Sequence, residues 1–354
     1  MRFDVERLAR PAIISMQAYQ SARSQMDGGG DSIYLDANEW GESDTPELSR
    51  YPNPQPPELV RELTTRFDIT PEHLFLGAGV DDAIDALVRV FCEAGQDSIL
   101  ITPPTYGYYA VAAAIQGAEV LAAPLSAGSF EVSEALILAK LRPSTKLVFI
   151  CNPNNPTGNS YQSQRWVKLA QALSPGALLV VDEAYIEFSA QPSLVREAAR
   201  PGNLVVLRTL SKAWGMAGVR LGAAVADPEV IKLMHKVRAP YPICRPAATA
   251  GAAELARLRP AILAARIARV TAERSKLAAG LAKLSLVEQV FASDANFLLI
   301  KTKDAARFMQ ICQRAGFTVR DRSREFLLAD CVRISVGAPA ENLALLAALN
   351  QGGA

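Results

Sequence analysis

Short apolar segments alternate with segments of helical periodicity through the middle of the chain. The apolar segments are apolar throughout rather than at every second position, which predicts strands buried on both faces of a sheet. The candidate strands are residues 73–77, 98–102, 119–124, 146–150, 177–181, 204–207 and 221–226, and the clearest helices are 81–93, 106–116 and 133–141. This alternation predicts an α/β fold with a mostly parallel, doubly wound central sheet.

The pattern changes after residue 245. Residues 247–284 are rich in Ala, Leu, Arg and Glu and predict one long or broken helix, with Pro260 as the breaking residue. Further strands are expected at 287–291, 296–301, 317–320 and 332–336, and helices at 303–315 and 340–350. We therefore expect a large domain over 46–245 and a smaller α+β domain over 246–354. Residues 1–45 have no strong period and are expected to drape over the small domain and the cleft.

Composition narrows the function classes. The chain has 354 residues, which favours two domains, and its 37 basic and 36 acidic residues give a net charge of +1. No strong positive field is available for a nucleic acid or an anionic membrane. The five cysteines are widely spaced and only two histidines occur, so a disulfide framework or a metal site is not expected. A start without an apolar targeting run and this cysteine usage predict a cytoplasmic protein.

The unusual residues follow the strands, where parallel sheets bind ligands. Lys212 comes shortly after strand 204–207, and Asp182 ends strand 177–181. A lysine whose pKa is lowered by burial and by a nearby cation such as Arg220 can hold a cofactor as a Schiff base. A buried carboxylate can face a ring nitrogen and keep it protonated. Together they favour pyridoxal phosphate over the alternatives of a solvated lysine and a helix-capping aspartate.

Three further loops agree with this interpretation. Residues 77–82 form a Gly-rich turn before a helix and can cradle a phosphate. Tyr106 can stack on an aromatic ring, and Asn155, in a loop stiffened by two prolines, can donate to a phenolate that Tyr185 also reaches. Each loop alone also fits an ordinary role: a βα turn, a packing tyrosine, or a turn built for its geometry.

The small domain supplies candidate anion ligands. Arg320 and Arg333 lie on strand-like segments and could fork onto the anionic end of a substrate. Arg322 and Arg324 lie on a polar stretch and are expected to be solvated. His73 and His235 are expected to have surface or satisfied structural roles.

These segments together resemble the fold-type I pyridoxal-phosphate enzymes, and most closely the histidinol-phosphate aminotransferases. The similarity runs over nearly the whole chain. It includes residues 19–23, 35–39, 50–52, 103–107, 154–158, 182–186, 210–222, 239–242 and 332–337. The Lys212 and Asn155 motifs identify the superfamily, and the segments around Tyr19, Asn38-Glu39 and Tyr241-Pro242 indicate the histidinol-phosphate branch. At one point the chain departs from the family, which usually continues Asn-Glu with Asn-Pro, because here Trp40-Gly41 follow.

The resemblance implies a role for each matching residue. Lys212 would hold the cofactor and move a proton between Cα and C4′, with Asp182 facing the pyridine nitrogen. The remaining cofactor contacts would be Tyr185 and Asn155 to the phenolate, Tyr106 to the ring, and the amides of Val80 and Asp81 with Thr209, Ser211 and Arg220 to the phosphate. Tyr51 would reach the phosphate in the other subunit of a homodimer. The substrate residues would be Tyr19, Arg320 and Arg333, with Asn38 and Glu39.

The implied reaction is amino transfer between L-histidinol phosphate and 2-oxoglutarate, giving imidazole-acetol phosphate and glutamate, in histidine biosynthesis. A threonine-phosphate decarboxylase and an aromatic amino-acid aminotransferase share the same motifs and stay open. A non-catalytic aminotransferase-like module is less favoured, because both Lys212 and Asp182 are present. A dinucleotide-binding dehydrogenase is also disfavoured, since no complete G-x-G-x-x-G follows the first strand.

Overall fold

The structure is a computed structural model, and it describes residues 3–19 and 33–353. Its larger sheet has seven strands in the order β1-β7-β6-β5-β4-β2-β3. The strands are β1 (Leu74–Gly77), β2 (Ser98–Ile101), β3 (Glu119–Ala122), β4 (Thr145–Cys151), β5 (Leu178–Asp182), β6 (Leu204–Thr209) and β7 (Gly222–Val225). Only β7 runs antiparallel to its neighbours β1 and β6. The predicted α/β fold with a mostly parallel sheet is confirmed.

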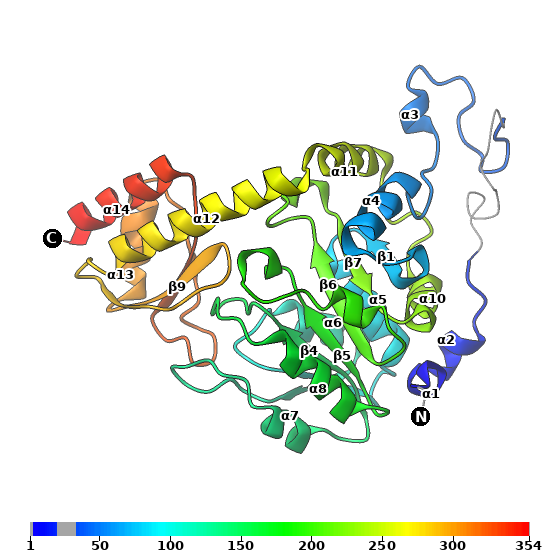
Figure 1. Cartoon of the computed structure of the whole chain (residues 1–354), viewed down its shortest axis with the longest axis horizontal. Coiled ribbons are helices and arrows are strands. Elements are labelled where there is room, and N and C mark those ends of the chain that lie inside the picture. The colour runs from blue at the N-terminus through cyan, green and yellow to red at the C-terminus, as the bar shows by residue number, and fades with distance from the viewer. Residues whose placement is uncertain (1–2, 20–32, 354) are drawn as a thin grey trace.

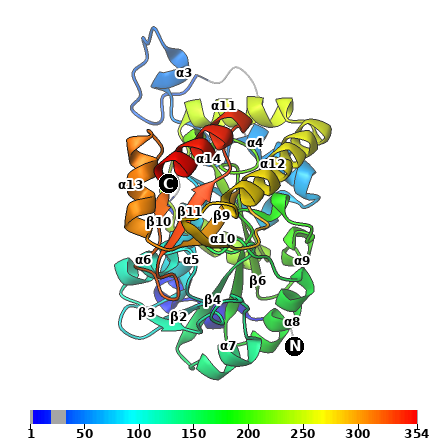
Figure 2. The ribbon, with the colours of Figure 1, turned by 90° about the vertical axis from the view of Figure 1, so that its left-hand side faces the viewer.

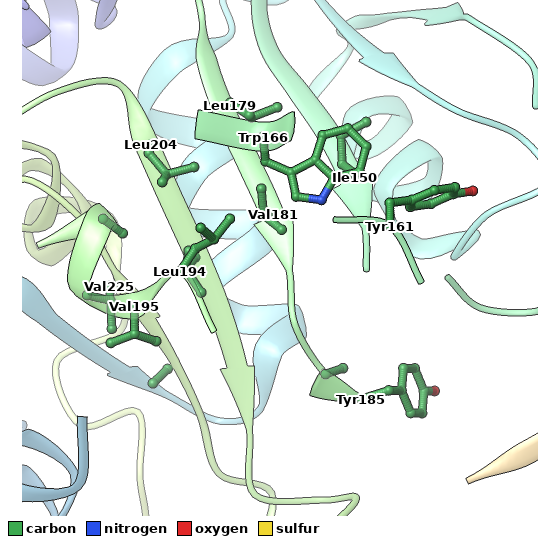
Figure 3. Close-up of a cluster of buried hydrophobic side chains, with 14 of the residues drawn as sticks. Ile150, Tyr161, Trp166, Leu179, Val181, Tyr185, Leu194, Val195, Leu204 and Val225 are labelled. Carbon is green, nitrogen blue, oxygen red and sulfur yellow. The ribbon is translucent and has the colours of Figure 1, made fainter. Parts of the chain in front are cut away.

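Both faces of this sheet are buried, as the unbroken apolar strands predicted. In β5, Leu179 and Val181 belong to one apolar cluster and Leu178 and Val180 to another, so successive side chains enter opposite cores. Figure 3 shows the first cluster, in which Trp166 packs over the sheet. The helices of this part are α4 (Pro57–Phe67), α5 (Val80–Phe91), α6 (Tyr108–Gln116), α7 (Glu134–Lys140), α8 (Ser163–Leu173), α9 (Val195–Ala198) and α10 (Pro228–Val237).

The C-terminal part holds a second sheet of four antiparallel strands in the order β10-β11-β9-β8. These are β8 (Val287–Val290), β9 (Phe297–Thr302), β10 (Arg320–Asp321) and β11 (Cys331–Ser335). The helices α12 (Pro260–Leu281), α13 (Ala305–Arg314) and α14 (Pro339–Gly353) pack on this sheet around an apolar cluster (Figure 2). The result is the smaller α+β unit that the change of pattern predicted.

Two segments differ from the expected elements. The helix over 247–284 is broken into α11 (Arg245–Arg257) and α12, because Pro260 occupies the first turn of a new helix. The strand expected at 317–320 is reduced to the two residues of β10. Phe317 instead closes the end of α13, with its amide donating to the Cys312 carbonyl at 2.8 Å. Phe317 and Val319 both pack against the apolar cluster of the small part. Their alternation with polar residues therefore resembled that of a strand.

The amino-terminal segment does not lie as expected. The helices α1 (Val5–Leu8) and α2 (Pro11–Ser15) pack against α5 and α10 of the large part, far from the small sheet (Figure 1). Arg10 Nε bonds Glu93 at 3.0 Å and Lys236 Nζ bonds the Ile14 carbonyl at 2.7 Å. For residues 3–15 the expected position over the small domain and cleft is therefore wrong. Their few apolar side chains were too short a pattern to show which core they join.

Residues 33–50, with α3 (Pro46–Ser49), extend away from the body of the molecule beside α11 (Figures 1 and 2). Several large apolar side chains of this extension face solvent in the single chain: Ile33, Leu35, Trp40 and Leu48. Over the described ranges, no helix has the length and apolar character needed to span a bilayer.

Candidate active site

A cavity of about 600 Å³ lies where the carboxyl ends of β4, β5 and β6 meet the small sheet. Among its lining residues are thirteen, from both parts of the molecule, that bear on its chemistry. From the large part come Val80, Asp81, Tyr106, Asn155, Asp182, Tyr185, Thr209, Ser211, Lys212 and Arg220, and from the small part Arg320, Arg322 and Arg333. Twelve of these are residues that the sequence pointed to, so one pocket gathers the loops that were predicted to act together.

Asp182 is buried at the base of the pocket. The Tyr109 hydroxyl donates to Oδ2 at 2.6 Å and the Ala184 amide to Oδ1 at 3.0 Å. Burial raises the pKa of Asp182 to about 6, although both hydrogen bonds favour the ionised form. A cationic N–H at this position would compensate the buried charge, as the pyridinium of pyridoxal phosphate would do. Tyr109 was not predicted as a site residue; it lies in the first turn of α6, three residues after Tyr106, which precedes the helix.

Lys212 lines the same pocket, with Nζ 5.6 Å from the centre of the Tyr185 ring. Burial lowers the pKa of Lys212, and the positive charge of Arg333 lowers it further, followed by that of Arg220. Arg220 was the cation expected to act on this amine, and the charge of Arg333 has the larger effect on its pKa. An amine with a lowered pKa is more often neutral and therefore nucleophilic, which suits covalent attachment of an aldehyde cofactor.

The amino terminus of α5 forms an anion cradle beside Lys212. Gly79 has φ of 95°, and a Cβ there would lie 2.7 Å from Arg220 Nη2. A Cβ at Gly222 would lie 2.3 Å from the Val80 amide nitrogen, so both positions require glycine. Asp81 accepts from the Tyr106 hydroxyl at 3.0 Å, and its other oxygen lies 3.5 Å from Arg220. Free amides at a helix start and a guanidinium are donors that fit the phosphate of the cofactor.

Asn155 is held by the small part of the molecule. Its Oδ1 accepts from Arg333 Nη1 and, at 3.3 Å, from Arg322 Nη2. Guanidinium groups only donate, so the atom that they contact must be the amide oxygen. Asn155 lines the pocket, and Nδ2 is the atom of its amide that could donate to a phenolate.

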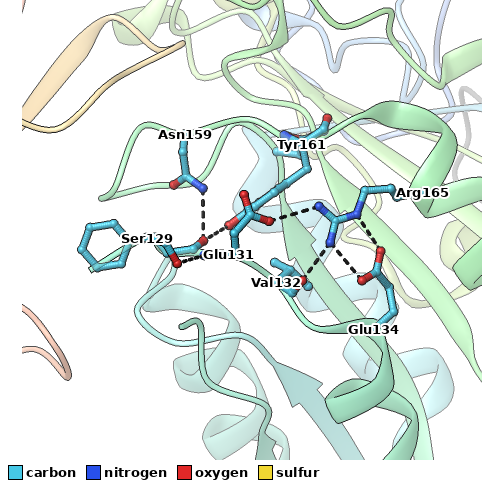
Figure 4. A network of polar contacts seen from close by, with 9 residues as sticks. Ser129, Glu131, Val132, Glu134, Asn159, Tyr161 and Arg165 are labelled. Carbon is cyan, nitrogen blue, oxygen red and sulfur yellow. Dashed lines mark hydrogen bonds and ion pairs between the residues drawn. The ribbon is translucent and has the colours of Figure 1, made fainter. Parts of the chain in front are cut away.

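The loop that carries Asn155 is firmly supported. Asn154 Nδ2 donates to the Pro104 carbonyl at 2.9 Å, and Asn159 Nδ2 donates to the Phe130 carbonyl at 3.1 Å. Behind it, Arg165 binds Glu134 through Nε at 2.6 Å and Nη2 at 2.9 Å, in the network that Figure 4 shows. Fixed supports of this kind keep a functional side chain in one direction.

The small sheet contributes a wall of three arginines, Arg320, Arg322 and Arg333. Arg320 and Arg333 face each other across the β10–β11 pair. Arg322 was expected to be solvated, and this is wrong: its side chain is only 12% exposed, lines the pocket and bonds Glu325 Oε1 through Nη1 at 2.5 Å. Side chains two positions apart on an extended strand share a face, so the spacing from Arg320 was the signal that could have found it. Arg324 is exposed, as expected.

Four of the expected site residues lie outside this pocket in the single chain. Tyr19 is 73% exposed, and Tyr51 stacks on Tyr241 with ring centres 4.4 Å apart. Glu39 accepts from Arg50 Nη1 at 2.9 Å and from the Tyr51 amide at 2.6 Å, and the neighbouring Asn38 is exposed. Residues 20–23 of the resemblance lie outside the described residues. The roles of these residues stay predictions.

The other candidates for chemistry have structural partners or surroundings. His73 Nδ1 lies 2.9 Å from the Ala226 carbonyl oxygen, and the His235 ring packs 5.4 Å from that of Phe75. Among the residues that the structure describes, no group of three or more His, Cys, Asp and Glu could hold a metal ion. The chemistry of the chain therefore concentrates on the pocket around Lys212.

Comparison with known proteins agrees with the fold and the pocket. The family model described as "Aminotransferase class I and II" matches residues 25–349, and the chain belongs to this family. Enzymes of the family work with pyridoxal phosphate.

Individual relatives narrow the similarity. The histidinol-phosphate aminotransferase of Xylella fastidiosa (strain 9a5c) is 41% identical over 349 residues, covering 97% of this chain and 95% of that protein. The histidinol-phosphate aminotransferase of Sinorhizobium meliloti, solved in complex with pyridoxal-5'-phosphate, superposes with a TM-score of 0.77 at 26% identity, covering 97% of this chain and 96% of that one. The L-threonine-O-3-phosphate decarboxylase of Porphyromonas gingivalis, at 22% identity and a TM-score of 0.72, covers 88% of this chain and 97% of its own and shares the fold alone.

Proposed function

We propose that this chain catalyses amino transfer between L-histidinol phosphate and 2-oxoglutarate, giving imidazole-acetol phosphate and L-glutamate in histidine biosynthesis. The observation that carries the proposal is the pocket itself, in which Lys212 and the buried Asp182 lie opposite three arginines. The first wall suits the cofactor and the second suits anionic substrates. The histidinol-phosphate aminotransferases that cover nearly the whole chain at about 40% identity support the choice of substrate.

The cofactor contacts follow from the observed positions. Pyridoxal phosphate supplies a ring that takes up the electron pair left when a Cα–H bond breaks. Lys212 would anchor it covalently and, once replaced by the substrate amine, would move the proton between Cα and C4′. Asp182 would hold a proton on the ring nitrogen, and Asn155 and Tyr185 would donate to the phenolate oxygen. Tyr106 would stack on the ring.

The phosphate of the cofactor would occupy the cradle at the start of α5. The donors there are the amides of Val80 and Asp81, the hydroxyls of Thr209 and Ser211, and Arg220. Arg220 would exchange its 3.5 Å contact with Asp81 for the phosphate. A stronger anion at the helix start favours this exchange.

The substrates would extend from the cofactor to the arginine wall. Arg320 and Arg333 would bind the phosphate of L-histidinol phosphate and, in the second half-reaction, a carboxylate of 2-oxoglutarate. Tyr19, Asn38 and Glu39 would complete the substrate site. The proposal includes no nucleic acid and no membrane, because the net charge of +1 provides no strong positive field for either.

We also propose that the enzyme is a cytoplasmic homodimer. The extension of residues 33–50 exposes large apolar side chains and leads to Tyr51, which lines a separate cavity of about 670 Å³ with Arg50 and Arg245. A second copy seated there would bury these side chains and bring Tyr51 to its cofactor phosphate. Five free cysteines, four of them buried, suit a reducing compartment.

A single-turnover absorbance experiment tests the substrate. Cofactor-loaded protein is mixed with L-histidinol phosphate without a keto acid. We expect conversion of the pyridoxal spectrum to the pyridoxamine spectrum, and reversal on addition of 2-oxoglutarate. A spectrum that ignores L-histidinol phosphate but responds to phenylalanine, or carbon dioxide released from threonine phosphate, would overturn the proposed substrate and favour one of the two related activities.

A further inference from the structure

The arginine wall contains a third arginine, Arg322, in addition to the two that are proposed to bind the substrate. Arg322 enters the pocket between Asn155 and Glu325, with Nη2 3.3 Å from Asn155 Oδ1 and Nη1 2.5 Å from Glu325 Oε1. Its Nε is buried and has no hydrogen-bond partner. A buried donor without a partner costs free energy that a bound anion would recover.

The charge balance of this wall suits a dianion. Arg320, Arg322 and Arg333 face the pocket with Glu325 as the carboxylate bonded to Arg322, which leaves two positive charges in excess. Asp321, on the other side of β10, is exposed and accepts from the Ser323 amide at 2.8 Å. Burial lowers the pKa of Arg322 and raises that of Glu325, which disfavours both charges, and the opposite charge of each partner counters this shift.

The shape of the ligand matters as well as its charge. A planar carboxylate is satisfied by one guanidinium fork, whereas a phosphate monoester presents three terminal oxygens and can engage three forks. The pocket offers three guanidinium groups on adjacent extended segments.

We propose that Arg322 is a specificity-determining residue that selects phosphate monoesters over carboxylate substrates, by joining Arg320 and Arg333 around the phosphate. This rests on the proposed function, because it concerns the same substrate site. Glu325 holds Arg322 in the pocket between turnovers and competes with the phosphate for it.

The test measures several variants of residue 322 and a control with several substrates. The half-reactions with L-histidinol phosphate, with L-histidinol and with glutamate are measured for wild type, Arg322→Gln, Arg322→Lys and the matched control Arg324→Gln, which removes an exposed arginine of the same loop. Arg322→Gln should raise the concentration of L-histidinol phosphate needed for half-maximal rate by about 10–100-fold, as loss of a charge-assisted bond implies. Reaction of L-histidinol and glutamate should change less than about threefold, because neither carries a phosphate.

Two further measurements keep the outcome decisive. Arg322→Lys retains the charge without the fork and should lie between wild type and Arg322→Gln. Glu325→Gln removes the competing carboxylate, and calorimetry should find tighter binding of inorganic phosphate than in wild type. If wild type converts L-histidinol phosphate but Arg322→Gln matches Arg324→Gln with every substrate, this inference is wrong and the proposed function stands. If wild type ignores L-histidinol phosphate, the proposed function itself fails.

Discussion

The two walls of the pocket are built in different ways. The cofactor wall, around Asp182 and Lys212, rises from the buried ends of β5 and β6. Asp182 there is buried and already has two hydrogen-bond donors. In the arginine wall, Arg320 is exposed on the two-residue strand β10, Arg322 follows that strand, and Arg333 lies on β11. Under the proposed function, the buried wall would fix the cofactor and the more exposed arginines would choose the substrate.

The largest test of this comparison removes the covalent anchor. Lys212→Ala should lower multiple-turnover amino transfer by at least about 10³-fold, because both the attachment of the cofactor and the proton transfer go. The matched control is Lys168→Ala, which removes an exposed lysine on α8 and should leave turnover unchanged. Turnover within tenfold of wild type in the Lys212 variant would show that this wall does not hold the chemistry.

Replacing the buried acid should have the next largest effect. Asp182→Asn removes the negative charge opposite the ring nitrogen, so we expect a loss of about 10² or more in rate, as for removal of a placed electrostatic partner. The variant should also release its cofactor during dialysis, which absorbance follows directly. A variant that keeps both its cofactor and its rate would show that the pyridine ring of the cofactor does not bind beside Asp182.

A third test asks whether the arginine wall changes the pKa of Lys212. Burial and then the charge of Arg333 lower the pKa of Lys212. Removing that positive charge in Arg333→Met should raise the pKa of Lys212, so that capture of pyridoxal phosphate by the cofactor-free protein shifts to higher pH. Absorbance measured from acid to alkaline pH gives the shift. An unchanged pH dependence of cofactor capture would show that Arg333 does not affect the pKa of Lys212.

The smallest effect is expected from the residue behind Asp182. Burial raises the pKa of Asp182, and the Tyr109 hydroxyl opposes that rise. Tyr109→Phe should therefore raise this pKa further, so that the cofactor-free site loses its negative charge at a higher pH and cofactor affinity falls off earlier as pH falls. The loss of one hydrogen bond, about 1.4 kcal/mol, should weaken cofactor binding by about tenfold. The control for packing is Phe149→Leu. It keeps the Tyr109 hydroxyl but removes the Phe149 ring that stacks on Tyr109.

The same contrast explains how far sequence reasoning reached. The cofactor wall follows the rule that ligands bind at the carboxyl ends of parallel strands, so Lys212, Asp182 and Asn155 were visible from their positions after apolar runs. Tyr109 was not, because a helix residue in an apolar run looks like any packing side chain.

The arginine wall was only half visible from the sequence. Arg320 and Arg333 stood on strand-like patterns, but Arg322 lay in a polar turn whose direction depends on how β10 pairs with β11. The amino-terminal segment was misplaced for a similar reason. A handful of apolar residues shows that a segment packs and does not show against which core.

The central claim is that Lys212 holds the cofactor covalently. Protein loaded with pyridoxal phosphate is reduced with borohydride, digested, and its peptides are identified by mass spectrometry. We predict a single pyridoxyl-modified peptide, with the modification on Lys212. A modification on another lysine, or an unmodified Lys212 peptide in protein that had bound the cofactor, would contradict the central claim.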